Sequence, residues 1–176
     1  LAVTGSVGKT TTKEMCAAIL SKSGRGSFSR KSFNNHIGVP YTVANLNLED
    51  RWAVLEMGMN HPGELAELTK IARPDAVIIT CIAPVHIEFF ESLAEIADAK
   101  CEILNGLQSG GIVVLNGEDR ELIAGYDRWQ AANADRKLQV KRFGHTNGYN
   151  LSISNVTPLG YEGSRFEITL GTQSTS

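Results

Sequence analysis

Cysteine and proline are scarce in this 176-residue chain, which has three cysteines and five prolines. Cys16, Cys81 and Cys101 are odd in number and form no C-x-x-C pair. This pattern argues against both a disulfide framework and a zinc knuckle. A reducing compartment suits such a chain, and we expect a cytoplasmic protein.

The chain also lacks a large net charge and long apolar runs. The net charge is −2 and the sequence has no dense Lys/Arg cluster, so nothing favours binding to nucleic acid. No apolar run approaches the length of a bilayer span, and no signal-peptide pattern opens the chain. We therefore expect neither a nucleic-acid partner nor membrane insertion.

The composition is that of an ordinary globular domain, with 42% hydrophobic and 20% charged residues. The length suits one domain with a substantial core. The chain opens at Leu1 on an apolar segment that runs directly into a glycine-rich turn. We expect a fragment, because natural proteins seldom begin inside a core strand.

Apolar runs alternate with segments of helical character. Strands are predicted at Leu1–Thr4, Trp52–Met57, Ala76–Ile82 and Ile112–Leu115, and helices at Lys9–Ser23, Pro62–Ala72, Ser92–Leu107 and Asp119–Ala134. The strand runs lack polar alternation, which is typical of strands covered on both faces. The sequence therefore predicts an α/β fold with a mostly parallel, doubly wound sheet.

The pattern changes after Phe143. Leu151–Val156 and Arg165–Leu170 alternate apolar and polar residues and are separated by turn residues. This predicts an antiparallel hairpin appended to the sheet. The tail Gly171–Ser176 carries no structural signal, so we expect a linker or a cut end there.

A phosphate-binding loop is the strongest motif. It follows the first strand, opens the first helix, and consists of Gly5, Ser6, Val7, Gly8, Lys9, Thr10 and Thr11. Backbone N–H groups of such a loop approach phosphate oxygens, and the helix N-terminus adds positive potential. Lys9 is predicted to reach the β- and γ-phosphates of ATP, and the Thr10 hydroxyl to hold Mg²⁺. A simple glycine-rich turn with a helix cap is the alternative interpretation.

The loop is shorter than the common G-x-x-x-x-G-K-[ST] motif, because Val3 occupies the first glycine position. Its T-G-x-x-G-K-T form resembles that of the Mur ligases and the related folylpolyglutamate synthases. Four further segments are similar to one branch of the Mur ligases: Asn34–Pro40, Glu56–Glu64, His86–Glu88 and Ala99–Ile103. That branch adds D-alanyl-D-alanine to UDP-N-acetylmuramoyl-tripeptide, the last cytoplasmic step of peptidoglycan precursor synthesis.

The resemblance runs from residue 1 to about Gly144 and covers one of three domains of that family. It implies that residues 1–176 form the central ATP-binding domain, without the outer domains that hold the UDP-sugar and help bind the incoming amine. It also implies that a substrate carboxylate attacks the γ-phosphate of ATP and that an amine then displaces phosphate. Such a reaction concentrates negative charge, so the site needs cations fixed in advance.

Two polar residues follow core strands. Glu56 ends the strand Trp52–Met57, and a carboxylate beyond the carboxyl end of a parallel strand suits Mg²⁺. The resemblance makes His86 a second metal ligand. Histidine is an unusual magnesium ligand, so a hydrogen-bonded histidine at a strand end is the alternative.

Lys100 stands out without any family comparison. It falls within the apolar stripe of helix Ser92–Leu107, four residues from both Ile96 and Leu104. An inward lysine is costly unless it is paired, functional or long enough to reach water. The resemblance implies that it is carbamylated by CO₂ and serves magnesium, so that Lys9, His86 and Lys100 form the catalytic set.

Four asparagines complete the candidate site. The resemblance places Asn116 against adenine, although an Asn-Gly turn before a helix cap explains it equally well. Asn34, Asn35 and Asn60 are candidate contacts to substrate or nucleotide.

Two other functions remain open. One is a sibling amide ligase such as a folylpolyglutamate synthase, against which the Asn34–Pro40 and Glu56–Glu64 segments argue. The other is a P-loop nucleotide-binding module without ligase activity. The combination of Glu56, His86 and Lys100 argues against that module, since a nucleotide switch has no need of an inward lysine.

Overall fold

A mostly parallel sheet forms the centre of the protein. The computed structural model describes residues 1–85, 89–145, 148–171 and 173–175, with side chains through residue 171. Within these residues the strand order is β2-β3-β1-β4-β5-β6-β7-β8-β9. The parallel strands are β1 (Ala2–Thr4), β2 (Gly26–Phe28), β3 (Trp52–Glu56), β4 (Ala76–Ile79), β5 (Ile112–Asn116) and β6 (Gln139–Gly144). The first strand lies inside the sheet, between β3 and β4.

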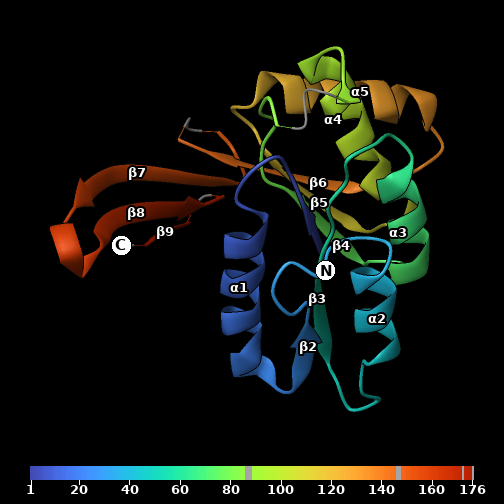
Figure 1. Ribbon diagram of the computed structural model, residues 1–176. Coiled ribbons are helices and arrows are strands. Elements are labelled where there is room, and N and C mark those ends of the chain that lie inside the picture. The colour runs from blue at the N-terminus through green and yellow to red at the C-terminus, as the bar shows by residue number, and fades with distance from the viewer. Residues whose placement is uncertain (86–88, 146–147, 172, 176) are drawn as a thin grey trace.

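Helices connect these strands and lie on both sides of them. They are α1 (Lys9–Leu20), α2 (Gly38–Ala44), α3 (Glu64–Ala72), α4 (Leu93–Cys101) and α5 (Arg120–Ala132). In Figure 1, α1 lies on one side of the β1–β3 region and α2 on the other. The predicted doubly wound α/β fold is therefore confirmed.

Two predicted helices are shorter than expected. The α-helical part of the first ends at Leu20, and Ser21–Ser23 form a 3₁₀ turn. Helix α4 ends at Cys101, and a 3₁₀ segment follows over Glu102–Gly106. A tightened last turn is a common way for a helix to satisfy its final carbonyl groups.

The main core lies between the sheet and helices α2–α5. Aliphatic residues of β4 and β5 contribute to it, namely Val77, Ile79, Val113 and Leu115. The helices contribute Leu65, Leu68, Ile96 and Leu122. Ser92 and Asp119 cap the N-termini of helices α4 and α5, where their side chains accept hydrogen bonds from Glu95 N and Leu122 N. Among the residues that the structure describes, every helix is too short or too polar to cross a bilayer.

The expectation that β4 and β5 are covered on both faces is wrong. Ile78 and Val114 are only half-buried, whereas their neighbours along each strand are buried. Both line an apolar hollow of about 630 Å³, which also touches Thr12 of α1 and Leu151 of β7. The α1 side of these strands is thus open, while the opposite face carries the core.

An arm of strands extends from the sheet beyond β6 (Figure 1). β7 (Leu151–Pro158) pairs parallel with β6 and antiparallel with β8 (Ser164–Leu170), and a 3₁₀ turn at Gly160–Glu162 joins the two. The predicted hairpin is therefore confirmed. The prediction for the tail is wrong, because Gln173–Thr175 form β9 antiparallel to β8. The edge of β8 offers backbone N–H and C=O groups, and these can pair with a neighbouring segment of any sequence. The side chains of such a segment therefore need not carry a strand pattern.

Candidate nucleotide and metal site

The phosphate loop lies between β1 and α1; it begins at the buried residues Gly5 and Ser6 and becomes exposed at Val7. Gly5 and Gly8 have positive φ angles of 144° and 83°, a region that glycine enters without a steric penalty. Val7, Gly8, Thr10 and Thr11 are exposed. Gly8 precedes the first residue of α1, and no side chain caps this end of the helix. This end of α1 is suited to bind an anion.

The loop is fixed by the segment that follows β4. Thr80 Oγ1 donates to Val7 O at 2.6 Å, and Ser6 N donates to Cys81 O at 2.8 Å. Ser6 Oγ donates to Ala83 O at 3.1 Å. Thr80 was not predicted as a site residue, because it fell inside the predicted strand Ala76–Ile82, whereas β4 ends at Ile79.

Lys9 is folded over its own loop. Its ammonium donates to Gly5 O at 2.8 Å and to Ser6 O at 3.1 Å. Burial lowers the pKa of Lys9, and the Glu56 carboxylate opposes that shift. Phosphate oxygens would replace these two carbonyl groups as stronger, charged acceptors.

Glu56 ends β3 as a buried carboxylate with one free oxygen. It is 1% exposed. Oε1 accepts a hydrogen bond from Asn34 Nδ2 at 2.8 Å, whereas Oε2 has no hydrogen-bond partner among the described residues. Buried polar atoms in native proteins are almost always partnered, and carboxylate oxygens are preferred Mg²⁺ ligands. The free oxygen of Glu56 therefore fits a divalent cation.

Lys13 is a buried cation that the sequence analysis missed. Its side chain is fully buried, and its ammonium donates to Ser29 O at 2.8 Å and Lys31 O at 2.9 Å. It also lies 2.9 Å from Glu14 Oε1 and 3.9 Å from Glu56 Oε2. The available signal was its position one helical turn from both Lys9 and Ala17, on the buried face of α1.

Lys100 of α4 is 2% exposed and points into the same hollow as Lys9. Its pKa falls to about 8, chiefly because of burial and secondly because of the positive charge of Lys9, while Cys81 opposes the shift. Their shared hollow of about 240 Å³ is also lined by Asn34, Asn35, Gly58, Met59, Asn60 and Glu64. The fold thus brings two lysines and three candidate asparagines together.

The asparagines also make local hydrogen bonds. Asn35 Oδ1 accepts from Ile37 N and Gly38 N, at 3.1 and 2.9 Å, at the start of α2. Asn116 Oδ1 accepts from Glu118 N at 3.1 Å, as expected for the turn interpretation. Asn60 contributes its backbone N–H to Glu64 Oε2 at 2.7 Å. His86 lies outside the described residues.

In the described part of the chain, no group of three or more His, Cys, Asp or Glu side chains is placed so that it could bind a metal ion. Glu56 and Thr10 each carry a side-chain oxygen atom of the kind that Mg²⁺ prefers.

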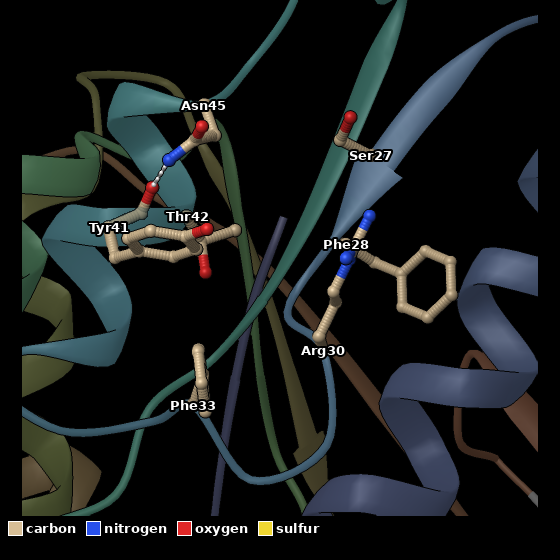
Figure 2. A pocket seen from close by; sticks show the side chains of 7 residues that line it. All are labelled: Ser27, Phe28, Arg30, Phe33, Tyr41, Thr42 and Asn45. Atoms are coloured by element: carbon tan, nitrogen blue, oxygen red, sulfur yellow. Dashed lines mark hydrogen bonds between the residues drawn. The ribbon is translucent and has the colours of Figure 1, made fainter.

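A separate hollow of about 220 Å³ lies between β2 and α2, away from the phosphate loop (Figure 2). It is lined by Ser27, Phe28, Arg30, Phe33, Tyr41, Thr42 and Asn45. Phe33 and Tyr41 meet edge to face with ring centroids 5.9 Å apart. None of the predicted site residues lines this hollow, so it does not belong to the candidate site.

Comparison with known proteins agrees with this geometry. Residues 3–173 match the family described as "Mur ligase middle domain". The UDP-N-acetylmuramoyl-tripeptide–D-alanyl-D-alanine ligase of Haemophilus influenzae is 41% identical over 160 residues, covering 89% of this chain and 33% of that enzyme. The enzyme of the same name from Escherichia coli is 42% identical over 138 residues, covering 78% of this chain and 30% of the relative. This chain thus spans about a third of the length of these relatives.

Solved structures give the same result. MurF from Acinetobacter baumannii superposes with a TM-score of 0.88 at 30% identity, covering 99% of this chain and 36% of that one. MurF ligase from Thermotoga maritima in complex with ADP has a TM-score of 0.83 at 27% identity, covering 99% and 38%. Together with the phosphate loop and the residues around it, these matches show that the chain belongs to the Mur ligase middle domain family.

Proposed function

We propose that this chain is the ATP-binding middle domain of a cytoplasmic ligase that joins D-alanyl-D-alanine to UDP-N-acetylmuramoyl-tripeptide. The proposal rests on the relatives of that name, which are 41% and 42% identical to this chain. The remaining substrate contacts are assigned to parts of the enzyme outside these 176 residues. The product is a peptide bond in a peptidoglycan precursor.

One observation carries the proposal: Lys9 and Lys100 line a single hollow, and the free oxygen of buried Glu56 lies close to Lys13. Formation of an acyl phosphate brings the triphosphate and a substrate carboxylate together. Cations that are fixed before the reaction stabilise this charge without reorganisation of the site. A charge arrangement of this kind suits phosphoryl transfer to a carboxylate.

Each candidate residue receives a role. Backbone N–H groups of Gly5–Thr11 and the Lys9 ammonium would bind the phosphates of ATP, and Asn116 would contact adenine. Thr10, Glu56, His86 and Lys100 would hold Mg²⁺. When bound, Mg²⁺ supplies charge neutralisation between phosphate and carboxylate oxygens. Asn34, Asn35 and Asn60 would contact substrate along the hollow that they line.

Lys100 would serve magnesium as a carbamate. Its pKa of about 8 leaves a useful fraction of neutral amine near neutral pH. The amine nitrogen attacks CO₂, a new N–C bond forms, and one proton leaves to solvent. The product is an anion with two oxygen atoms, so an unfavourable buried cation is exchanged for a ligand that Mg²⁺ prefers.

The test is a ligation assay with the intact protein, ATP, Mg²⁺, UDP-N-acetylmuramoyl-tripeptide and D-alanyl-D-alanine. We expect ADP, phosphate and the pentapeptide product in equal amounts, and no product when any one substrate is omitted. Ligation of glutamate to a folate instead would identify the sibling ligase, whose Lactobacillus casei member shares the fold at 17% identity. ATP binding with no ligation of either substrate pair would favour a nucleotide-binding module and reject the proposal.

A further inference from the structure

The ammonium of Lys13 joins three parts of the site. It extends from α1, the helix that carries the phosphate loop, to two carbonyl groups of the loop that follows β2. It also faces Glu56 at the end of β3. We propose that Lys13 is a positioning residue that sets the orientation of the Glu56 carboxylate toward Mg²⁺. This inference rests on the proposed function, because it assigns a role toward the metal of that site.

The loop held by Lys13 is the one that holds Glu56. Ser29 Oγ accepts a hydrogen bond from Glu56 N at 3.0 Å, and Asn34 Nδ2 donates to Glu56 Oε1 at 2.8 Å. Asn34 O in turn accepts from Gly58 N at 2.7 Å, just beyond β3. A shift of this loop therefore disturbs both the backbone N–H and the carboxylate of Glu56.

The loop needs an external support. Lys31 has a φ angle of 50°, a left-handed conformation that non-glycine residues rarely adopt. Its carbonyl is one of the two that Lys13 binds. A strained backbone conformation persists only where its surroundings enforce it. Lys13 thus keeps a disfavoured turn in the shape that presents Asn34 to Glu56.

The charge of Lys13 completes the arrangement. Its nitrogen lies 3.9 Å from Glu56 Oε2, close enough for electrostatic attraction but too far for a hydrogen bond. Four other partners face the ammonium: the carbonyl groups of Ser29 and Lys31, the Glu14 carboxylate at 2.9 Å, and the Phe28 ring with its centroid at 5.7 Å. Since Asn34 occupies Oε1 and Lys13 leaves Oε2 unbonded, Oε2 is the oxygen available to a cation.

A purely structural role predicts a different outcome. If Lys13 only satisfied buried carbonyl groups, its loss would lower thermal stability and weaken every activity together. A positioning role predicts that the Mg²⁺ requirement rises while Mg²⁺-free nucleotide binding persists. The phosphate loop and Lys9 supply that binding, whereas the Lys13 ammonium donates its hydrogen bonds to Ser29 O and Lys31 O of another loop.

The experiment uses the intact protein and measures ADP binding by calorimetry, in EDTA and across a Mg²⁺ series. The variants are Lys13→Met, Lys13→Arg and the control Lys22→Met, which alters an exposed lysine beyond the end of α1. We expect Lys13→Met to raise the half-saturating Mg²⁺ concentration by about 10- to 100-fold, the range for residues that orient a metal ligand. Lys13→Arg should give a smaller rise, and Lys22→Met none. ADP affinity in EDTA should stay within about twofold of wild type, because no charge-assisted phosphate contact is removed.

An unchanged Mg²⁺ requirement in every Lys13 variant that folds overturns the inference. So does an equal loss of ADP affinity with and without Mg²⁺, accompanied by a lower melting temperature. If Lys13→Met fails to fold, Lys13→Arg decides alone, and a wild-type Mg²⁺ requirement in that variant is the overturning result. A wild-type protein without Mg²⁺-dependent ADP binding would reject the proposed function itself, and with it this inference.

Discussion

Thr80 and Val7 are joined by a short hydrogen bond of 2.6 Å, from the Thr80 hydroxyl to the Val7 carbonyl. The contact presses the end of β4 against the phosphate loop. A Cβ atom placed on Gly5 would lie 1.9 Å from Thr80 Oγ1, and the φ angle of Gly5 is 144°. Gly5 is therefore required both by its backbone conformation and by the close approach of Thr80.

Gly5→Ala should destabilise the protein by roughly 2–5 kcal/mol, the sum of a strained backbone and an overpacked contact. Gly63→Ala is the matched control. Gly63 also has a positive φ of 89° but has open space around its missing Cβ, so only the strain of about 1–2 kcal/mol applies. Urea unfolding of both variants measures the difference. Equal losses would show that the Thr80 contact adds nothing.

Lys9→Ala should weaken ATP binding at least about tenfold, because a charge-assisted phosphate contact contributes roughly 1.5–3 kcal/mol. The fold should persist, since Lys9 is only partly buried and its two hydrogen bonds stay within its own loop. Calorimetry on wild type, Lys9→Ala and Lys22→Ala compares a loop lysine with an exposed lysine outside the site. Equal affinities for wild type and Lys9→Ala would reject the assignment of this loop.

Stability should rise with pH because of Lys100. Its pKa is about 8 in the folded protein, against an ordinary value of 10.5 in the unfolded chain. Between these values the unfolded chain binds the proton and the folded protein does not, so rising pH favours folding, by about 3 kcal/mol at most. Lys100→Met should remove this rise and stabilise the protein at neutral pH. Unfolding curves across this pH range that are parallel for wild type and variant would contradict the prediction.

Carbamylation of Lys100 predicts chemical rescue. Lys100→Ala in the intact enzyme should lose ligation by about 10- to 100-fold or more, the cost of disturbing a metal ligand. Short carboxylic acids that enter the vacated space should restore part of the rate. Neutral amides of the same size serve as the control, because they carry no anionic oxygen. Full activity of Lys100→Ala would reject the role.

Long segments with a clear period could be predicted from sequence, and short or polar segments could not. The strand containing Ala76–Ile79 and the helix at Arg120–Ala132 were predicted because apolar side chains mark them. β2 has only three residues, α2 contains Pro40 and several β-branched residues, and β6 is mostly half-buried or exposed. Contacts with the rest of the fold, rather than local sequence preference, determine these three elements. They were therefore not predicted from the sequence.

The candidate site was predictable where residue type alone carries the signal. Glycine spacing marked the phosphate loop, and Lys100 was conspicuous in an apolar stripe. Lys13 and Thr80 were missed because their importance comes from partners distant in sequence, Ser29, Lys31 and Val7. A lysine in the first turns of an amphipathic helix has no sequence feature that separates a buried cation from a solvated one.

The internal position of β1 has a consequence for folding kinetics. Among the described residues, β1 pairs with β3 and β4, which are both synthesised later, and Ala2 lies opposite Leu55 and Val77. Closing such long loops costs entropy before any contact forms, which slows folding. During synthesis the phosphate loop cannot adopt its final shape until β4 has left the ribosome, because Thr80 and Cys81 hold it. We therefore expect nucleotide to bind only after β4 has joined the sheet, so that it slows unfolding without accelerating folding.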